Sequence, residues 1–118
     1  MKFTKKQIER YSRQIVLKKI GIIGQKKISN SKVLLVGAGG LGSPIAIYLA
    51  AMGIGKIGIV DKDNVEFSNL SRQIIFSNND INKSKSSAAA SKISKINPNV
   101  KVHSFRKKLN IKNINKIA

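Results

Sequence analysis

The chain has 118 residues, of which 23 are lysine or arginine and only 5 are aspartate or glutamate, so its formal net charge is +18. This length predicts a single domain. The sequence has no cysteine, which excludes disulfides and thiolate metal sites, and its one histidine, His103, cannot build a metal site alone. No apolar run reaches the roughly 18 residues of a membrane span, and no signal peptide opens the chain. We therefore expect a cytoplasmic protein without a membrane partner.

The excess of positive charge has two interpretations. Lysine scattered among asparagine and isoleucine is typical of a solvated surface, and all three residues have AT-rich codons. The alternative is a polyanion or an acidic partner. Nucleic acid is not favoured, because the four Phe and two Tyr residues do not alternate with the lysines as a stacking platform requires.

A capping box opens the chain, with Thr4 as the cap and Gln7 three residues later. Apolar residues follow at helical spacing, so residues 4–18 are predicted to form one amphipathic helix. Gly21 and Gly24 are expected to break this pattern, with only a short helical turn before the first strand.

The next segment is the most informative. An apolar run at 33–36 leads into a glycine-rich loop at 37–42, a helical segment at 43–52 and a second apolar run at 56–60. Strand, glycine turn, helix and strand in this order are typical of a nucleotide-binding unit. The dipole of the helix favours phosphate beside the loop. Asp61 ends the second strand near the spacing at which a carboxylate accepts ribose hydroxyls.

Four glycines of the loop support this interpretation. Gly37 permits the tight turn, Gly39 lets backbone N–H groups approach phosphate, and Gly42 lets the helix pack close to the strand. Gly40 adds a glycine that chain reversal alone does not require. A simple glycine turn is therefore the weaker alternative.

The acidic residues are concentrated. Asp61, Asp63 and Glu66 fall within six residues, directly after the second strand. A basic chain that gathers its carboxylates at one strand end is predicted to use them for ribose, magnesium or a positive partner. A local cluster of salt bridges is the alternative.

The remaining elements are predicted to be a short helix, a long helix, a strand and a last helix, at residues 68–73, 82–96, 100–105 and 111–118. Asn97-Pro98 ends the long helix, and Asn110 is the expected cap of the last one.

The alternation of strands and helices predicts an α/β fold: a Rossmann-like parallel sheet of three strands with flanking helices, preceded by an N-terminal helix. Three strands make one mononucleotide-binding half. Residues 1–118 are expected to form one truncated domain, with a helical segment at 1–30 and β-α-β-α-β-α at 31–118. The first strand is central in such folds, so its open edge predicts either a second chain or a fragment.

Four stretches form a recognisable set of motifs, together with Lys85 at the start of a helix. They are R-Y-S-R-Q-I at 10–15, G-A-G-G-L-G at 37–42, D-K-D-N-V-E-F-S-N-L-S-R-Q at 61–73, and I-N-P at 96–98. The set resembles the N-terminal half of the ThiF/MoeB/HesA family, bacterial relatives of ubiquitin-activating enzymes. The run at 61–73 does not belong to dehydrogenases.

The resemblance implies an ATP-dependent adenylyltransferase that activates the C-terminal carboxylate of a ubiquitin-like sulfur-carrier protein, in molybdopterin or thiamine biosynthesis. The carboxylate attacks the α-phosphate of ATP and pyrophosphate leaves, so cations must neutralise the phosphates. The implied catalytic residues are Arg72, Lys85 and Arg13, the last as an arginine finger across a dimer interface. The implied cofactor-binding residues are Gly37, Gly39, Gly40, Gly42, Asp61, Asp63, Ser68, Asn69, Leu70, Ser71, Arg72 and Lys85. For Arg72 and Lys85 the alternative is a plain surface charge.

The chain ends before the family's next strand, whose Asp binds magnesium and ATP, and before the zinc-binding Cys pairs. No metal ligand is therefore assigned, although Mg²⁺ is expected with ATP and Asp63 lies close enough to substitute. A homodimer or a completing subunit is expected. The alternative functions are a non-catalytic remnant that binds nucleotide or a partner, an NAD-dependent half-domain, and an electrostatic nucleic-acid binder.

Overall fold

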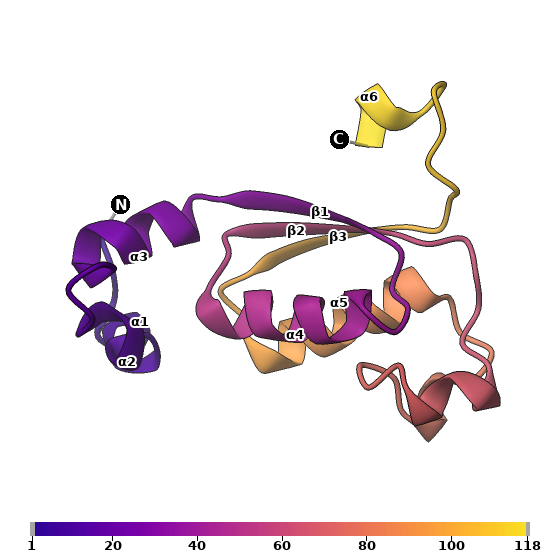
Figure 1. The fold of residues 1–118 in the computed structure, drawn as a ribbon, viewed down its shortest axis with the longest axis horizontal. Helices are drawn as coiled ribbons and strands as arrows, with labels where there is room; N and C mark the ends of the chain where they lie inside the picture. Colours follow the sequence, from indigo (N-terminus) through magenta and orange to yellow (C-terminus); the bar gives the residue numbers. More distant parts are fainter. Residues whose placement is uncertain (1, 118) are drawn as a thin grey trace.

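A parallel sheet forms the centre of the computed structural model, which describes residues 2–117 (Figure 1). The strands are β1 (Lys32–Val36), β2 (Lys56–Val60) and β3 (Lys101–Phe105), in the order β1-β2-β3. They pair in step, so that Lys32 lies beside Lys56 and Lys56 beside Lys101. The predicted Rossmann-like α/β fold with three parallel strands is confirmed.

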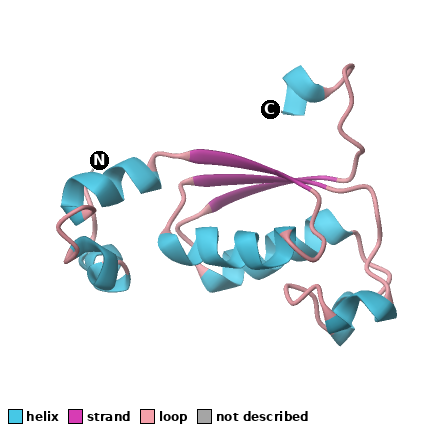
Figure 2. Ribbon diagram, in the orientation of Figure 1, coloured by secondary structure: helices cyan, strands magenta, loops and turns pink. Residues whose placement is uncertain are grey.

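One face of the sheet carries the core. Helices α4 (Gly42–Met52) and α5 (Lys85–Ile96) cover this face, as Figure 2 shows, and within residues 2–117 only the short α6 (Ile114–Ile117) lies on the side of the other face. Ile57 and Ile59 of β2 are fully buried in the core, as is Ile93 of α5. Because side chains alternate along a strand, the residues between them face away from α4 and α5.

The edge of the sheet at β1 has no neighbouring strand among residues 2–117. Val36 at its end is 63% exposed, although it belongs to an apolar strand of the kind found inside sheets. The open edge expected from the sequence is therefore present.

The single helix predicted over residues 4–18 is wrong. The structure has α1 (Lys5–Arg10) and α2 (Ser12–Ile15), separated at Tyr11. The capping box is confirmed, since the Thr4 hydroxyl accepts from the Gln7 N–H at 3.1 Å. The helix breaks because the Tyr11 ring turns inward: it is 2% exposed, and its hydroxyl accepts from the Asn97 amide at 3.0 Å.

The two glycines expected to interrupt the N-terminal helices instead lie within α3 (Gly21–Ser29). Gly21, at a φ of +57°, turns the chain into this helix, and Gly24 lies inside it. A tertiary contact overrides their low helix propensity. The buried Gln25 donates to the Met52 carbonyl at 3.0 Å, which attaches α3 to the end of α4.

Two short 3₁₀ helices, η1 (Phe67–Ser71) and η2 (Asn78–Asp80), interrupt the connection from β2 to α5. Helix α5 begins later than residue 82, because Asn82 adopts a φ of 69° and donates to the Val65 carbonyl. Residues 82–84 thus run beside the backbone of 63–65, and the helix begins at Lys85.

The last helix, α6, is shorter than predicted. Residues 111–113 form turns, while the Asn110 side chain accepts from the Asn113 N–H at 2.9 Å, as expected of a cap. The predicted end at residue 118 lies outside the described residues. Within residues 2–117, no helix combines the length and apolar character that crossing a membrane requires.

Candidate functional site

The candidate site lies at the carboxyl ends of β1 and β2. In parallel α/β sheets the loops that leave this edge form the ligand crevice. Residues 37–42 connect β1 to α4, and Asp61 follows β2 directly. The sheet therefore brings together the two features that the sequence separates by about twenty residues.

Two glycines of the loop are required by its geometry. Gly37 has a φ of +98°, which side chains rarely adopt. A Cβ at Gly42 would collide with the carbonyl oxygen of Gly37, so the first turn of α4 can approach β1 only without a side chain. By contrast, a Cβ at Gly40 would meet nothing within 4 Å. The space above Gly40 is open on the side where a ligand would lie.

The first turn of α4 is free of side-chain caps. Its cap residue, Leu41, makes no side-chain hydrogen bond, and no acidic residue lies in the first turn. Backbone N–H groups at a helix N-terminus carry about half a positive charge and bind anions well. Helix α4 thus presents a phosphate-compatible end next to Gly39 and Gly40.

Asp61 is fixed against the loop. One carboxylate oxygen accepts from the Ala38 N–H at 2.8 Å and the other from the Asp63 N–H at 2.8 Å. A carboxylate has about four acceptor positions, so about two remain for ribose hydroxyls. Asp61 therefore both holds the glycine loop to the end of β2 and keeps capacity for a ligand.

A small hollow of about 160 Å³ opens beside Asp61. Its wall includes Lys62 and three residues after β3: Lys107, Lys108 and Leu109. Sequence analysis gave these three no role. Their position directly after the third strand was the available signal, because parallel strands end at the same edge of the sheet.

The run at 61–73 contributes backbone more than free side chains. Asn69 is 7% exposed and its side-chain oxygen accepts from the Glu66 N–H at 2.8 Å. Leu70 packs against the core. Ser68 and Ser71 are exposed, and a hydrogen bond of 3.4 Å joins the Ser71 hydroxyl to the Ser68 carbonyl.

The two nearby cations differ in burial. Arg72 is exposed and donates to the Ser68 carbonyl at 3.3 Å. Lys85 is 8% exposed at the start of α5, and its backbone N–H donates to the Asp63 carbonyl at 3.0 Å. Lysine is rarely this buried unless it has a partner. Lys85 is thus not one of the solvated surface lysines, whereas Arg72 is free to move toward a ligand.

Gln73 is a further residue to which the sequence assigned no role. It is 4% exposed, and its Oε1 is the one buried side-chain N or O atom without a hydrogen-bond partner in the described part of the chain. The Gln73 side chain lies beside the glycine loop, since a Cβ built at Gly39 would be 3.9 Å from Nε2 of Gln73. Its place at the end of the 61–73 motif was the signal that pointed to it.

Arg13 is not brought to the site. It is exposed on α2, which lies beyond the amino ends of the strands, at the far end of the sheet from residues 37–42 (Figure 1). Within one chain, Arg13 cannot act on a ligand held by the glycine loop.

Comparison with curated proteins gives clear relatives. A protein of Porphyra purpurea named "Probable molybdopterin-synthase adenylyltransferase" is 50% identical over 107 residues, which are 91% of this chain and 28% of that protein. The sulfur carrier protein adenylyltransferase of Thermus thermophilus is 39% identical over 113 residues, or 96% of this chain and 42% of that protein. The chain spans less than half the length of each.

Solved structures and the family model agree with these relatives. The crystal structure of Escherichia coli MccB with ATP matches with a TM-score of 0.83 at 32% identity, over 92% of this chain and 34% of that chain. The model of the ThiF family matches residues 11–118, which include the glycine loop, Asp61 and the 61–73 motif. The chain therefore belongs to the ThiF family.

Proposed function

We propose that this chain is the nucleotide-binding part of an ATP-dependent adenylyltransferase that activates the C-terminal carboxylate of a ubiquitin-like sulfur-carrier protein. The observation that carries the proposal is Asp61, hydrogen-bonded to the glycine loop beside the uncapped N-terminus of α4. Relatives named as adenylyltransferases of sulfur carriers and of molybdopterin synthase support the reaction class. A cytoplasmic location, where ATP is abundant, is part of the proposal.

In this proposal the nucleotide lies across the carboxyl edge of the sheet. Asp61 accepts the ribose hydroxyls, and the N–H groups of the loop and of α4 contact the phosphates. Gly39 and Gly40 leave the backbone open to a phosphate, and the backbone of 68–71 is expected to close the site. Asp63 is exposed, and its backbone N–H donates to the Asp61 carboxylate at 2.8 Å, which keeps it near the same region.

Three cations carry the chemical step. The carrier's carboxylate oxygen attacks the α-phosphorus of ATP, the bond to the bridging oxygen breaks, and pyrophosphate leaves with the negative charge. Arg72 and Lys85 neutralise the phosphate oxygens as charge develops. Arg13 completes the set from a second copy, since it lies away from the site in its own chain.

Mg²⁺ would enter with ATP. Among residues 2–117, no group of three or more potential side-chain ligands is gathered for a metal. Mg²⁺ typically keeps several waters and binds through one or two carboxylates plus substrate phosphates. Asp63 fits the role of such a single carboxylate.

The partner is proposed to be a second copy or a completing subunit. Exposed apolar residues recur every three or four positions from residue 41 to residue 52. They are Leu41, Ile45, Tyr48 and Met52, whose exposed fractions are 82%, 45%, 69% and 38%. They form an apolar stripe along α4, next to the open edge of β1. Tyr48→Glu places a charge in the middle of this stripe. Light scattering at micromolar concentration should show the wild type as an assembly and this variant as a monomer; a monomeric wild type would contradict the proposal.

The experiment for the function has two stages. ATP and NAD⁺ are titrated separately against the chain, and we expect binding of ATP only, which excludes the dehydrogenase alternative. ATP–pyrophosphate exchange with a sulfur carrier is then measured. No exchange is expected from the chain alone, because we do not expect it to hold the carrier's carboxylate in place. Such positioning can lower the activation barrier by roughly 7–11 kcal/mol. A full-length relative is then added in which Ala replaces the arginine that matches Arg13. If exchange returns only when this chain carries an intact Arg13, the role of Arg13 in trans is supported.

The second candidate is a non-catalytic chain that binds nucleotide or a partner. The observation in its favour is that Arg13, on α2, lies at the far end of the sheet from the glycine loop, so one chain by itself does not bring the three proposed cations together (Figure 1). Retained ATP binding with no exchange under any combination of subunits would favour this alternative.

A further inference from the structure

We propose a second ligand site at the amino edge of the sheet, which binds a small anion rich in phosphate groups. The site centres on a row of three lysines, Lys32, Lys56 and Lys101, here called the lysine row. It is separate from the nucleotide site, because the two lie at opposite ends of the same strands, about 15 Å apart at the usual rise per residue.

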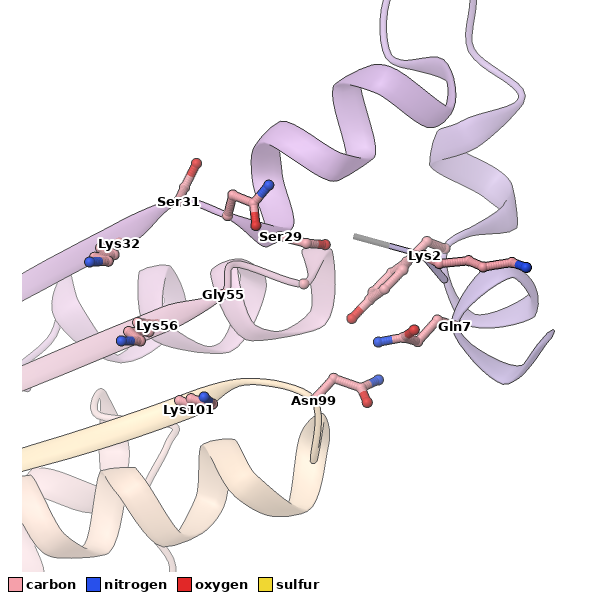
Figure 3. Close-up of a pocket in the computed structure, with 12 residues that line it drawn as sticks. Lys2, Gln7, Ser29, Ser31, Lys32, Gly55, Lys56, Asn99 and Lys101 are labelled. Atoms are coloured by element: carbon pink, nitrogen blue, oxygen red, sulfur yellow. The ribbon is translucent and has the colours of Figure 1, made fainter. Parts of the chain in front are cut away.

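The register of the sheet creates the row. Lys32 pairs with Lys56, and Lys56 with Lys101, at the first position of each strand. The next residue in each strand packs on the core, so the three lysines share the opposite face. Adjacent strands lie about 4.8 Å apart, so the row presents three ammonium groups over about 10 Å. Figure 3 shows the three side chains one above another.

Such a row is unfavourable without a counterion. Like charges directly opposite each other on neighbouring strands destabilise a sheet. Among residues 2–117, no aspartate or glutamate lines this region. The carboxylates gather instead at the other end, where Asp61 and Asp63 lie. An anion shared by the three ammonium groups would remove their repulsion.

The row lies beside a hollow that suits a small ligand. The hollow has a volume of about 360 Å³, within the usual range for small-molecule sites of about 300–1,000 Å³. Asn99 and Gln7 add neutral polar groups, whereas the Ser31 hydroxyl points away from the hollow and donates to the Lys27 carbonyl at 2.7 Å (Figure 3). Lys2 also borders the hollow, but its ammonium points away from the row in Figure 3.

Phosphate is the group that fits this chemistry best. Lysine binds phosphate as a compact point charge, and several phosphate oxygens can each face a different ammonium. A single carboxylate would leave most of the row unneutralised. The site therefore takes an oligophosphate or the phosphorylated end of a small metabolite, which share this chemistry.

The test uses sodium tripolyphosphate and the ¹⁵N-labelled chain. Amide shifts of Gly55 and Asn99 report on the amino edge, and those of Gly39 and Gly40 report on the nucleotide loop. We expect shifts at Gly55 and Asn99 that persist in Arg72→Ala, which weakens the other site. Shifts confined to Gly39 and Gly40 would overturn the proposal. These amide shifts are measured without ATP. They therefore test the second site even if the proposed function fails.

Matched variants separate the site from general electrostatics. Replacing Lys32, Lys56 and Lys101 with Gln should weaken tripolyphosphate binding at least about tenfold, since each charge-assisted contact is among the stronger hydrogen bonds. A control replaces Lys18, Lys92 and Lys112 with Gln, which removes the same charge from exposed positions outside the hollow. We expect less than about a twofold change there.

Equal losses of tripolyphosphate affinity in the two variants would overturn the proposal. Tighter binding of a single-stranded oligonucleotide, with amide shifts spread beyond the hollow, would also overturn it. Glucose 6-phosphate and pyrophosphate, tested in parallel, distinguish a phosphorylated metabolite from an oligophosphate.

Discussion

The two edges of the sheet bind charge in different ways. At the carboxyl edge, backbone N–H groups and one carboxylate hold a fixed geometry, since Asp61 bonds to both Ala38 and Asp63. At the amino edge, flexible lysine side chains supply the charge. Backbone groups are already ordered when a ligand arrives, whereas lysines lose up to about 2 kcal/mol of rotamer freedom each. The carboxyl edge is therefore suited to orienting a reacting nucleotide, and the amino edge to neutralising an anion.

The largest expected effect comes from the glycine that each edge requires. A Cβ at Gly42 would collide with the Gly37 carbonyl, and a Cβ at Gly55 with the Ser29 carbonyl. Gly42→Ala and Gly55→Ala should each lower the free energy of unfolding by about 3 kcal/mol, measured by urea denaturation. Gly40→Ala is the control, because its Cβ would enter open space, and it should change stability little. If Gly40→Ala were as destabilising as Gly42→Ala, the geometry of the loop would be wrong.

Asp61→Asn should weaken ligand binding at the carboxyl edge and not at the amino edge. The variant loses a charged acceptor, so ATP affinity should fall by about 1.5–3 kcal/mol in calorimetric titration. Asp80→Asn serves as the control, because among residues 2–117 the carboxylate of Asp80, in η2, accepts hydrogen bonds from Ser77 alone. Tripolyphosphate binding at the amino edge should be unchanged. Equal ATP affinities of wild type and Asp61→Asn would remove Asp61 from the site.

Asn97 tests how the amino edge is held to the N-terminal helices. Its buried amide donates to the Tyr11 hydroxyl and to the Ala50 carbonyl at 2.8 Å. Asn97→Ala should lower the free energy of unfolding by about 2 kcal/mol, because it leaves buried acceptors without a donor. Tyr11→Phe removes one partner only, so we expect about 1 kcal/mol. A larger loss from Tyr11→Phe than from Asn97→Ala would contradict this account, because Tyr11→Phe keeps the ring and removes only the hydroxyl that the Asn97 amide contacts.

The smallest expected difference is in the response to salt. Exposed lysines are screened by ions more than groups fixed in a crevice. Raising NaCl from about 0.05 M to about 0.5 M should therefore weaken tripolyphosphate binding at the amino edge several-fold more than ATP binding at the carboxyl edge. Both affinities come from the same calorimetric series. Parallel slopes would mean that the two edges do not differ in the way described.

The carboxyl edge was largely predictable from sequence because its signals are local. The loop at 37–42 and Asp61 belong to one strand–helix–strand unit, so spacing alone brings them together. Gln73 and Lys107–Leu109 were missed, because their positions depend on how the later segments return to that edge.

The amino edge and the N-terminal helices depend on long-range pairing. The lysine row requires the register of three strands, which no local pattern fixes. The break at Tyr11 depends on Asn97, 86 residues away. Helix α3 keeps Gly21 and Gly24 because Gln25 bonds to the end of α4, a contact that intrinsic propensity does not contain.

The bond between Tyr11 and Asn97 also has a consequence for the order of folding. Contacts between residues far apart in sequence form late, because the intervening chain must first be closed into a loop. During synthesis the N-terminal helices emerge first, yet the amide that holds Tyr11 is added 86 residues later. During synthesis the Tyr11 hydroxyl therefore lacks this partner until Asn97 has been added and has left the ribosome.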